Sequence, residues 1–255
     1  MRTTLLGLPV DILSFGETLA LAEEAMRSGL RRQHVALNVA KLVNARREPE
    51  LDRDIRSSDI IGIDGMGIVW ALRLLGEVRA ERVPGIDLFE RLIGRCAATG
   101  FRPYLLGATA EVVAAAEAEL MRRHPGLVVA GRHHGYFTAA DEAEICARIA
   151  ASGAHCLFVA MPTPRKERFM LRNRDRLAVP FVMGVGGSFD VVAGKVQRAP
   201  GLVQRLGLEW AFRLAQEPRR LAARYAKTNA VFGWLLAREI VARLTARRIR
   251  ASSPG

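Results

Sequence analysis

Two segments of the chain place a carboxylate beside glycines, a combination that suits the binding of an anion. Asp64 precedes the run Gly65-Met66-Gly67, and the glycine-rich segment from Gly184 to Asp190 ends in a second carboxylate. Glycine lets a ligand approach the backbone closely, and N–H groups at the start of a helix bind anions. A helix cap and a catalytic base are both consistent with Asp64, and the adjacent glycines favour the base.

Sequence motifs for several other kinds of active site are missing. Gly65-Met66-Gly67 resembles the start of a dinucleotide-binding fingerprint, but Trp70 occupies the third glycine position and the run follows the second predicted strand. The chain has neither a phosphate-binding P-loop nor a nucleophilic-serine elbow. His133 and His134 are adjacent, without an acid or a cysteine at ligand spacing, so we expect no metal site.

Six short apolar runs alternate with helical patterns, and we expect them to be the strands that position these residues. The runs are His34 to Asn38, Ile60 to Asp64, Pro103 to Gly107, Leu127 to Gly131, Cys156 to Met161 and Phe181 to Val185. This alternation predicts an α/β fold over residues 1–197, with a doubly wound, mostly parallel sheet of Rossmann-like type. Ligands of such sheets bind beyond the carboxyl ends of the strands, where the candidate segments lie.

The strand pattern ends near Pro200, and a helical pattern follows. We expect residues 198–245 to form a basic helical appendage, with a break between two helices at Pro218, and residues 246–255 to form a disordered tail. Apolar residues recur every fourth position along one face of the first predicted helix: Leu202, Leu206, Trp210 and Leu214. This spacing is typical of an amphipathic helix.

The positive charge of the chain is concentrated in this appendage. The sequence has 38 Lys and Arg against 26 Asp and Glu, a net charge of +12, of which residues 198–255 carry +9. A basic helix with an apolar face suits an anionic membrane surface. Nucleic acid is a competing partner, but no recognisable nucleic-acid module supports it. A solvated helix face without a partner is the third interpretation.

No stretch of the sequence is long enough for a membrane-spanning helix. The best uncharged apolar stretch near the C-terminus, Thr228 to Ala237, has about half of the ~20 residues required. The first residues do not resemble a secretory signal, because Gly7 and Pro9 interrupt their apolar run. The three cysteines lie in predicted helices or strands: Cys96, Cys146 and Cys156. We therefore expect buried thiols and a reducing cytosol.

Taken in chain order, these segments resemble the WecG/TagA/CpsF family of bacterial glycosyltransferases from about Leu5 to Arg224. The matching segments are Leu37-Asn38, Lys41-Leu42-Val43, Ala45-Arg46, Asp64 to Ala71, Glu81 to Leu88, His134 to Phe137, Gly184 to Pro200, Gly207 to Trp210 and Gln216 to Arg220. The number and order of these segments make a chance match very improbable.

The resemblance implies an inverting transfer of a hexose-type sugar from a UDP donor to a sugar linked to polyprenyl diphosphate, in cell-surface polysaccharide biosynthesis. It implies no essential metal and no cofactor, a peripheral location on the cytoplasmic face of the membrane, and a homo-oligomer as an option. A single displacement needs one base, and Asp64 occupies the family's catalytic aspartate position.

The resemblance also assigns substrate-binding positions. Arg82 and Lys166 are candidate cations for the departing UDP, Asn38 is a candidate hydrogen-bonding residue, and Asp190 suits ribose hydroxyls. The remaining candidate substrate contacts are Gly107, Tyr136, Gly186 and Gly187. Three appendage residues are candidates for binding the membrane or the acceptor diphosphate: Arg213, Arg220 and Arg224.

Two positions depart from the family pattern. Ala36 stands where the family commonly has Thr, and Lys166 stands where the motif Pro-x-Gln-Glu has Gln. Lys166 suits a diphosphate or a donor carboxylate, and a solvent-facing lysine beside Arg165 is the alternative. The donor therefore stays open among N-acetylmannosamine, its uronic acid, glucose and other hexoses, and the acceptor sugar stays open as well.

Overall fold

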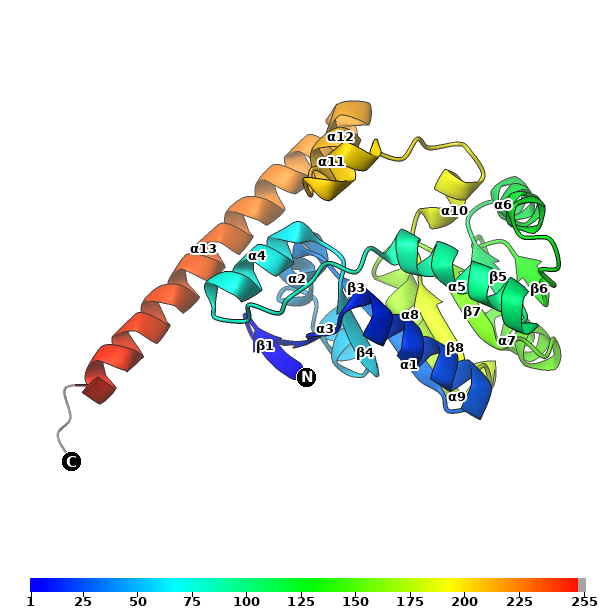
Figure 1. Ribbon diagram of the computed structural model, residues 1–255, viewed down its shortest axis with the longest axis horizontal. Coiled ribbons are helices and arrows are strands. Elements are labelled where there is room, and N and C mark those ends of the chain that lie inside the picture. Colours follow the sequence, from blue (N-terminus) through cyan, green and yellow to red (C-terminus); the bar gives the residue numbers. More distant parts are fainter. Residues whose placement is uncertain (252–255) are drawn as a thin grey trace.

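The computed structural model describes residues 1–251, apart from the side chains of Arg205, Arg213, Arg220, Leu221, Arg224 and residues 246–251. Its centre is a parallel sheet of six strands in the order β4-β3-β8-β7-β5-β6 (Figure 1). The strands of this sheet are β3 (Arg32–Leu37), β4 (Ile60–Ile63), β5 (Pro103–Gly107), β6 (Gly131–His133), β7 (Cys156–Ala160) and β8 (Phe181–Gly184). The predicted α/β fold with a parallel sheet is therefore confirmed.

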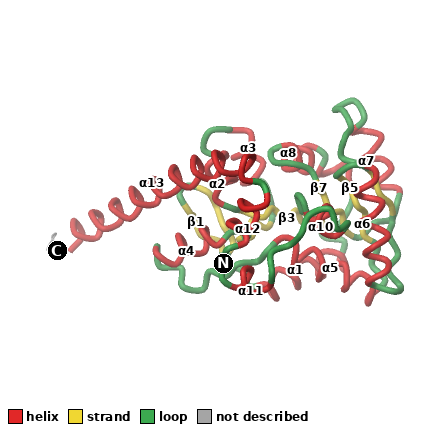
Figure 2. Tube along the Cα trace, turned by 90° about the horizontal axis from the view of Figure 1, so that it is seen from above, coloured by secondary structure: helices red, strands yellow, loops and turns green. Residues whose placement is uncertain are grey.

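Helices cover both faces of this sheet. One face is covered by α2 (Val39–Ala45), α3 (Pro49–Arg56), α7 (Glu142–Ala151), α8 (Arg165–Arg172) and α9 (Arg174–Leu177). The opposite face is covered by α1 (Phe15–Ser28), α5 (Gly85–Thr99), α6 (Ala110–Arg123) and α10 (Ser188–Val192) (Figure 2). Alternate residues of β7 enter the two apolar cores, because successive strand residues point to opposite faces.

An N-terminal hairpin that the sequence analysis did not predict covers the edge strand β4. Its strands are β1 (Arg2–Leu5) and β2 (Leu8–Asp11), which pair antiparallel. The Asp11 carboxylate accepts a hydrogen bond from the backbone N–H of Ile61 in β4 at 2.8 Å, and Arg2 donates two hydrogen bonds to the same carboxylate. The hairpin thereby satisfies part of an exposed sheet edge.

The strand predicted at Leu127 to Gly131 is wrong by several residues, because β6 is Gly131–His133. Leu127 is buried in the apolar core, but it precedes the strand, and pairing with β5 begins only where Gly131 lies opposite Tyr104. A Cβ at Gly131 would lie 2.7 Å from the Tyr104 ring, so glycine permits this pairing. The apolar run marks core packing rather than strand position.

The C-terminal region consists of α11 (Gly201–Arg205), α12 (Glu209–Gln216) and α13 (Pro218–Ala251), and α4 (Met66–Leu74) lies beside it (Figure 1). The single helix predicted from Leu202 to Leu214 is wrong, because Gly207, at φ 72°, separates α11 from α12. The predicted break at Pro218 is confirmed. α13 continues to Ala251, past the predicted end at Thr245, because the residues after Thr245 include the strong helix formers Ala and Arg.

Only part of α13 packs against the rest of the chain. Phe232 and Leu235 are buried in the same apolar core as α2 and the hairpin. Arg243 donates a hydrogen bond to the carbonyl of Leu75, just beyond the end of α4, at 3.2 Å. The helix then extends past the sheet toward the C-terminus (Figure 1). Residues 252–255 of the predicted tail lie outside the described residues.

Candidate active site

The carboxyl ends of β3, β4, β7 and β8 meet at one edge of the sheet and bring several predicted residues together. Asn38 follows β3, Asp64 follows β4, Lys166 follows β7 and Gly186 follows β8. Backbone hydrogen bonds extend the pairing past the strand ends, from the Asp64 N–H to the Leu37 carbonyl at 3.0 Å. A parallel sheet therefore places these polar groups side by side.

Asp64 lies between two backbone segments that fix its position. Its Oδ1 accepts a hydrogen bond from the N–H of Gly85 at 3.1 Å, and it is partly buried. The N-cap position of α4 belongs to Gly65, so the interpretation of Asp64 as a helix cap is wrong. A Cβ at Gly65 would lie 3.3 Å from Cβ of Asn38, and glycine thus brings the turns after β3 and β4 together. One carboxylate oxygen is anchored, and no described residue donates to the other.

Asn38 is the N-cap of α2. Its Oδ1 accepts a hydrogen bond from the backbone N–H of Lys41 at 2.9 Å, which satisfies one unpaired donor at the start of the helix. Because the amide oxygen is used in this way, the Nδ2 group is the part of Asn38 that suits a substrate oxygen. The predicted position at the tip of β3 is where the structure places it.

Behind these residues lies a buried ionic cluster, which consists of Lys41, Lys166 and Glu167. Glu167 Oε1 lies 2.8 Å from Lys41 Nζ and 3.0 Å from Lys166 Nζ. Lys41 also donates a hydrogen bond to the carbonyl of Ala36 at 2.7 Å, and Lys166 donates one to the hydroxyl of Thr163 at 2.5 Å. The side chain of Lys166 is 9% exposed, so its interpretation as a solvent-facing lysine is wrong.

The cluster changes the protonation of its members. Burial lowers the pKa of Lys166 to about 8, and the neighbouring Lys41 ammonium acts in the same direction, while Glu167 and Asp64 oppose both. Burial alone would raise the pKa of Glu167, but the two lysines outweigh it and lower that pKa to about 2. Glu167 is therefore ionised at neutral pH, and Lys166 titrates close to it.

Sequence reasoning did not assign a role to Lys41 or Glu167. Both residues lie in segments that carry the family resemblance, at Lys41-Leu42-Val43 and Pro164-Arg165-Lys166-Glu167. The signal in the sequence was Lys41 followed by two apolar residues, which suggests a buried lysine. Burying a lysine ammonium group costs free energy unless a carboxylate lies close to it. The sequence does not show which carboxylate supplies that partner.

Arg82 connects the candidate base to the C-terminal helices. Its Nε donates a hydrogen bond to the backbone carbonyl of Asp64 at 2.8 Å, and its Nη1 donates one to the carbonyl of Gln204 at 3.4 Å. Its Nη2 forms an ion pair with Glu209, the first residue of α12, and Glu209 also lies 3.8 Å from Arg198. Arg82 therefore lies at the predicted site with part of its charge already balanced by Glu209.

The glycines and Asp190 after β5 and β8 lie along the same edge of the sheet. Gly107 has φ 136°, and a side chain there would collide with the backbone of Ala160 in the neighbouring strand, so strand packing already explains this glycine. Gly186 has φ 55°, and a Cβ at Gly187 would lie 3.9 Å from the Asp190 carboxylate. The turn after β8 thus lies beside Asp190, and the role of these residues as nucleotide contacts stays a prediction.

Tyr136 lies in a segment that turns back from β6 over the ends of β5 and β7. The N–H of the preceding Gly135 donates a hydrogen bond to the carbonyl of Ala108, and the carbonyl of the following Phe137 accepts one from Arg165, the residue before Lys166. Tyr136 is 73% exposed. Its role as a substrate contact stays a prediction, and the contact between Phe137 and Arg165 places this segment beside the start of α8, where Lys166 lies.

The three arginines predicted to bind an acceptor diphosphate cannot be placed relative to Asp64. Arg213 belongs to α12, and Arg220 and Arg224 belong to α13, but their side chains lie outside the described residues. Their role stays a prediction.

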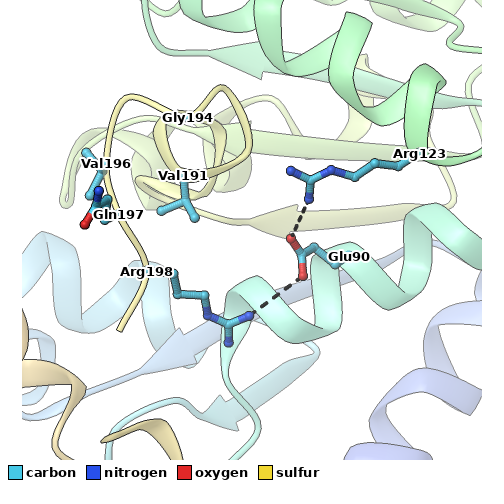
Figure 3. Close-up of a pocket in the computed structure, with 7 residues that line it drawn as sticks. All are labelled: Glu90, Arg123, Val191, Gly194, Val196, Gln197 and Arg198. Atoms are coloured by element: carbon cyan, nitrogen blue, oxygen red, sulfur yellow. Dashed lines mark hydrogen bonds and ion pairs between the residues drawn. The ribbon is translucent and has the colours of Figure 1, made fainter. Parts of the chain in front are cut away.

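Two cavities lie apart from the predicted site residues. One has a volume of about 430 Å³ and is lined by Glu90, Arg123, Val191, Gly194, Val196, Gln197 and Arg198 (Figure 3). The other has a volume of about 600 Å³ and lies around Glu90, Arg95 and His124. In the first, Glu90 already pairs with Arg123 at 3.5 Å and with Arg198 at 3.8 Å. Each charged side chain that lines it therefore already has an ionic partner, whereas the strand ends hold groups that suit catalysis.

Other expectations concern metals, membranes and thiols. Within residues 1–251, as far as their side chains are described, no group of three or more His, Cys, Asp or Glu residues is placed to hold a metal ion. Over the same described residues, no helix combines the length and the apolar character needed to cross a membrane. The predicted buried thiols are confirmed at Cys96, Cys146 and Cys156, and the first and last of these lie 3.7 Å apart.

The geometry of the strand ends agrees with the comparison of the sequence with known families. Asp64, Asn38, Arg82 and Lys166 lie together at the edge where parallel sheets bind ligands. The family model described as "Glycosyl transferase WecG/TagA/CpsF family" matches residues 3–246 of the 255. Since this match covers nearly the whole chain, the protein belongs to the WecG/TagA/CpsF family of glycosyltransferases and has a role in polysaccharide biosynthesis.

Proposed function

We propose that this glycosyltransferase moves a hexose-type sugar from a UDP donor to a hydroxyl of a sugar linked to polyprenyl diphosphate, with inversion at the anomeric carbon. The observation that carries the proposal is the position of Asp64. Its carboxylate is anchored through one oxygen by the N–H of Gly85, and its backbone carbonyl accepts a hydrogen bond from Arg82. A base beside a fixed positive group is the arrangement that this transfer needs.

In the proposed reaction the acceptor hydroxyl attacks the anomeric carbon on the face opposite the UDP group. The Asp64 carboxylate removes the hydroxyl proton while the new glycosidic bond forms. The bond between the anomeric carbon and the diphosphate oxygen breaks, and its electron pair leaves with UDP. Because Oδ1 of Asp64 is held by the Gly85 N–H, Oδ2 is the oxygen that would receive the proton. One displacement inverts the configuration and requires a single base.

The departing UDP gains negative charge, which fixed positive groups and N–H donors can stabilise. Arg82 donates a hydrogen bond to the backbone carbonyl of the candidate base, and the turn after β8 supplies backbone N–H groups near Asp190. We propose that these groups bind the diphosphate without an essential metal, and that the positive charge of Lys166 contributes to binding of the donor. Asp190 would then accept hydrogen bonds from the ribose hydroxyls of the donor.

We further propose that the C-terminal helices hold the enzyme on an anionic membrane that contains the acceptor. The large apolar residues Leu202, Leu206, Trp210 and Trp234 are exposed on these helices, and residues 198–255 carry a net charge of +9. Each Lys or Arg near an anionic surface contributes about 1 kcal/mol to binding. Apolar and basic groups together suit peripheral binding at the cytoplasmic face.

A donor panel tests the proposed reaction. The full chain would be incubated with UDP-sugars and a short-chain prenyl-diphosphate-linked sugar, and the products would be identified by mass and by anomeric configuration. We expect one added hexose residue from one or a few UDP donors, with inverted configuration. Retained configuration, or no product and no UDP binding, would contradict the proposal. Duplex or single-stranded DNA in the same binding assay tests the competing nucleic-acid partner.

A further inference from the structure

The buried cluster behind Asp64 contains more positive than negative groups. Lys41 and Lys166 are both buried, and Glu167 is the only carboxylate that the described residues place within ion-pair distance of either lysine. An unbalanced buried charge is costly unless another charge or a ligand compensates for it. Asp64 lies near enough to act on Lys166 electrostatically, but it forms no ion pair with that lysine among the described contacts. The cluster is therefore suited to receive an anion.

The side chain of Lys166 is held in one place by its surroundings. Its stem crosses Gly184 at the end of β8, where an added Cβ would lie 3.1 Å from both Cδ and Cε. Its ammonium group donates to the Thr163 hydroxyl at 2.5 Å and contacts Glu167 at 3.0 Å. An ammonium group has three donors, so the described residues leave one of them unused.

Glu167 forms ion pairs with both Lys41 and Lys166, so its single negative charge does not fully neutralise Lys166. The same oxygen of Glu167, Oε1, contacts both ammonium groups, while Oε2 is buried without a hydrogen-bond partner among the described residues. Lys41 is fixed in turn by the carbonyl of Ala36 at 2.7 Å. Glu167 and Lys41 thus position Lys166 without balancing its charge completely.

We propose that Lys166 is a specificity-determining residue that binds an anionic oxygen of the donor, with Lys41 and Glu167 as positioning residues. The anion is either the diphosphate or a carboxylate on the transferred sugar. This inference rests on the proposed function, because it takes the ligand to be a UDP-sugar. A glutamine at this position would not have the same effect, since a neutral amide cannot supply a full positive charge.

The protonation of Lys166 gives the inference a pH dependence. The charged groups that face Lys166 are Lys41 from α2, Glu167 from α8 and Asp64 from the end of β4. Because burial lowers the pKa of Lys166 to about 8, its ammonium form is progressively lost above that pH. Affinity for the anion should therefore fall as the pH rises through 8, and anion binding should raise the pKa.

Calorimetric titrations with UMP, UDP, UDP-glucose and UDP-glucuronate test the inference on the full chain and on Lys166→Gln. If the anion is the diphosphate, the variant should bind UDP and both UDP-sugars about ten- to a hundredfold more weakly and UMP much as the wild type does. If the anion is a carboxylate, UDP affinity should be unchanged, and only the preference for UDP-glucuronate over UDP-glucose should disappear. Unchanged affinities for all four ligands would overturn the inference.

Two controls keep this test decisive. Arg148→Gln removes an exposed positive charge on α7 and should leave all four affinities within about twofold of the wild-type values. A weaker affinity in this variant would mean that the overall positive charge of the protein, and not Lys166 itself, attracts the ligands.

If Lys166→Gln does not fold, the wild type alone decides through UDP-sugar affinity between pH 7 and pH 9.5. The affinity should fall by about tenfold per unit above pH 8, and a constant affinity would overturn the inference. A wild type that binds no UDP ligand contradicts the proposed function instead.

Discussion

The strand ends bury charged side chains, whereas the C-terminal helices expose apolar side chains. At the strand ends, Lys41, Lys166 and Glu167 are buried in contact with one another. On the C-terminal helices, large apolar side chains such as Leu202 and Trp234 are exposed, at 61% and 58%. Buried and fixed charges suit the recognition of one small ligand, whereas a broad apolar and basic surface suits an extended partner.

The two regions are joined by a small number of named contacts. Arg82 contacts the Asp64 carbonyl on one side and Glu209 on the other. A Cβ at Gly207 would collide with Met66 at the start of α4, so the turn between α11 and α12 lies directly on the segment that follows Asp64. A change in the C-terminal helices can therefore affect the position of the candidate base.

Glu167→Gln should produce the largest change in stability at the strand ends. It leaves the ammonium groups of Lys41 and Lys166 buried without a carboxylate, and breaking such a cluster costs about 3–5 kcal/mol. Urea unfolding would measure the change. Glu144→Gln, which removes an exposed carboxylate paired with Arg148, should cost less than about 1 kcal/mol. Equal losses in the two variants would contradict the assignment of a buried ionic cluster.

Replacing exposed apolar residues on α13 should weaken membrane binding without affecting the strand ends. Serine at Trp234, Val241 and Leu244 removes side chains whose burial contributes about 1.5–3 kcal/mol each, so partition onto anionic vesicles should fall by more than about a hundredfold. Sedimentation with vesicles would measure the partition, and UDP affinity should not change.

The matched control for that variant carries serine at Leu30, Met121 and Val128, which are exposed on the sheet domain. Vesicle binding equal to that of the wild type is expected. A similar loss of vesicle binding in both triple variants would show that the exposed apolar residues of α13 are not the membrane-binding surface. Point substitutions are preferable to deletion of residues 200–255, because deletion would uncover the core contacts of Phe232 and Leu235.

Glu209→Gln tests the link between the two regions. It removes the ionic partner of Arg82 while leaving the Arg82 hydrogen bond to the Asp64 carbonyl possible. The loss of one partly buried ion pair should reduce the rate of sugar transfer by about tenfold, through a less fixed Arg82. Transfer rates with a saturating donor would measure the effect. A rate equal to the wild-type rate would indicate that the link does not influence the base.

The smallest expected effect concerns His34 in β3, below the strand ends. Burial lowers the pKa of His34 to about 4, so the folded state keeps the ring neutral while the unfolded state takes up a proton below about pH 6.5. The free energy of unfolding should therefore fall by about 1 kcal/mol between pH 7 and pH 5.5. His34→Leu should remove this part of the pH dependence when the free energy of unfolding is measured in urea. If the free energy of unfolding of the variant depended on pH as strongly as that of the wild type, His34 would not be the group responsible.

The sequence predicted the fold where the pattern was local. Alternating apolar runs gave five of the six sheet strands with their ends within a few residues, and Pro218 gave the start of α13. The hairpin was missed because each strand has four residues and its position depends on a contact from Asp11 to Ile61. The α11–α12 turn was missed because a glycine at φ 72° is not distinguishable from a helical glycine by spacing.

The candidate site was predictable only in part, for a similar reason. Asp64, Asn38 and Lys166 follow strands, so the general rule for parallel sheets already placed them together. The pairs that set their electrostatics, Lys41 with Glu167 and Arg82 with Glu209, join residues more than a hundred positions apart. No spacing or periodicity encodes such a pair, and only the folded chain identifies it.

The central claim is that Asp64 is the base of a sugar transfer, and the Asp64→Asn variant tests it most directly. The amide is nearly isosteric and still accepts the Gly85 hydrogen bond, but it cannot take the acceptor proton. With UDP-sugar and a prenyl-diphosphate-linked acceptor, we expect turnover to fall by about 10²- to 10⁴-fold while UDP affinity is preserved. Asp175→Asn, at a carboxylate that is 98% exposed, should transfer sugar at the wild-type rate. Near-normal turnover by Asp64→Asn would contradict the account.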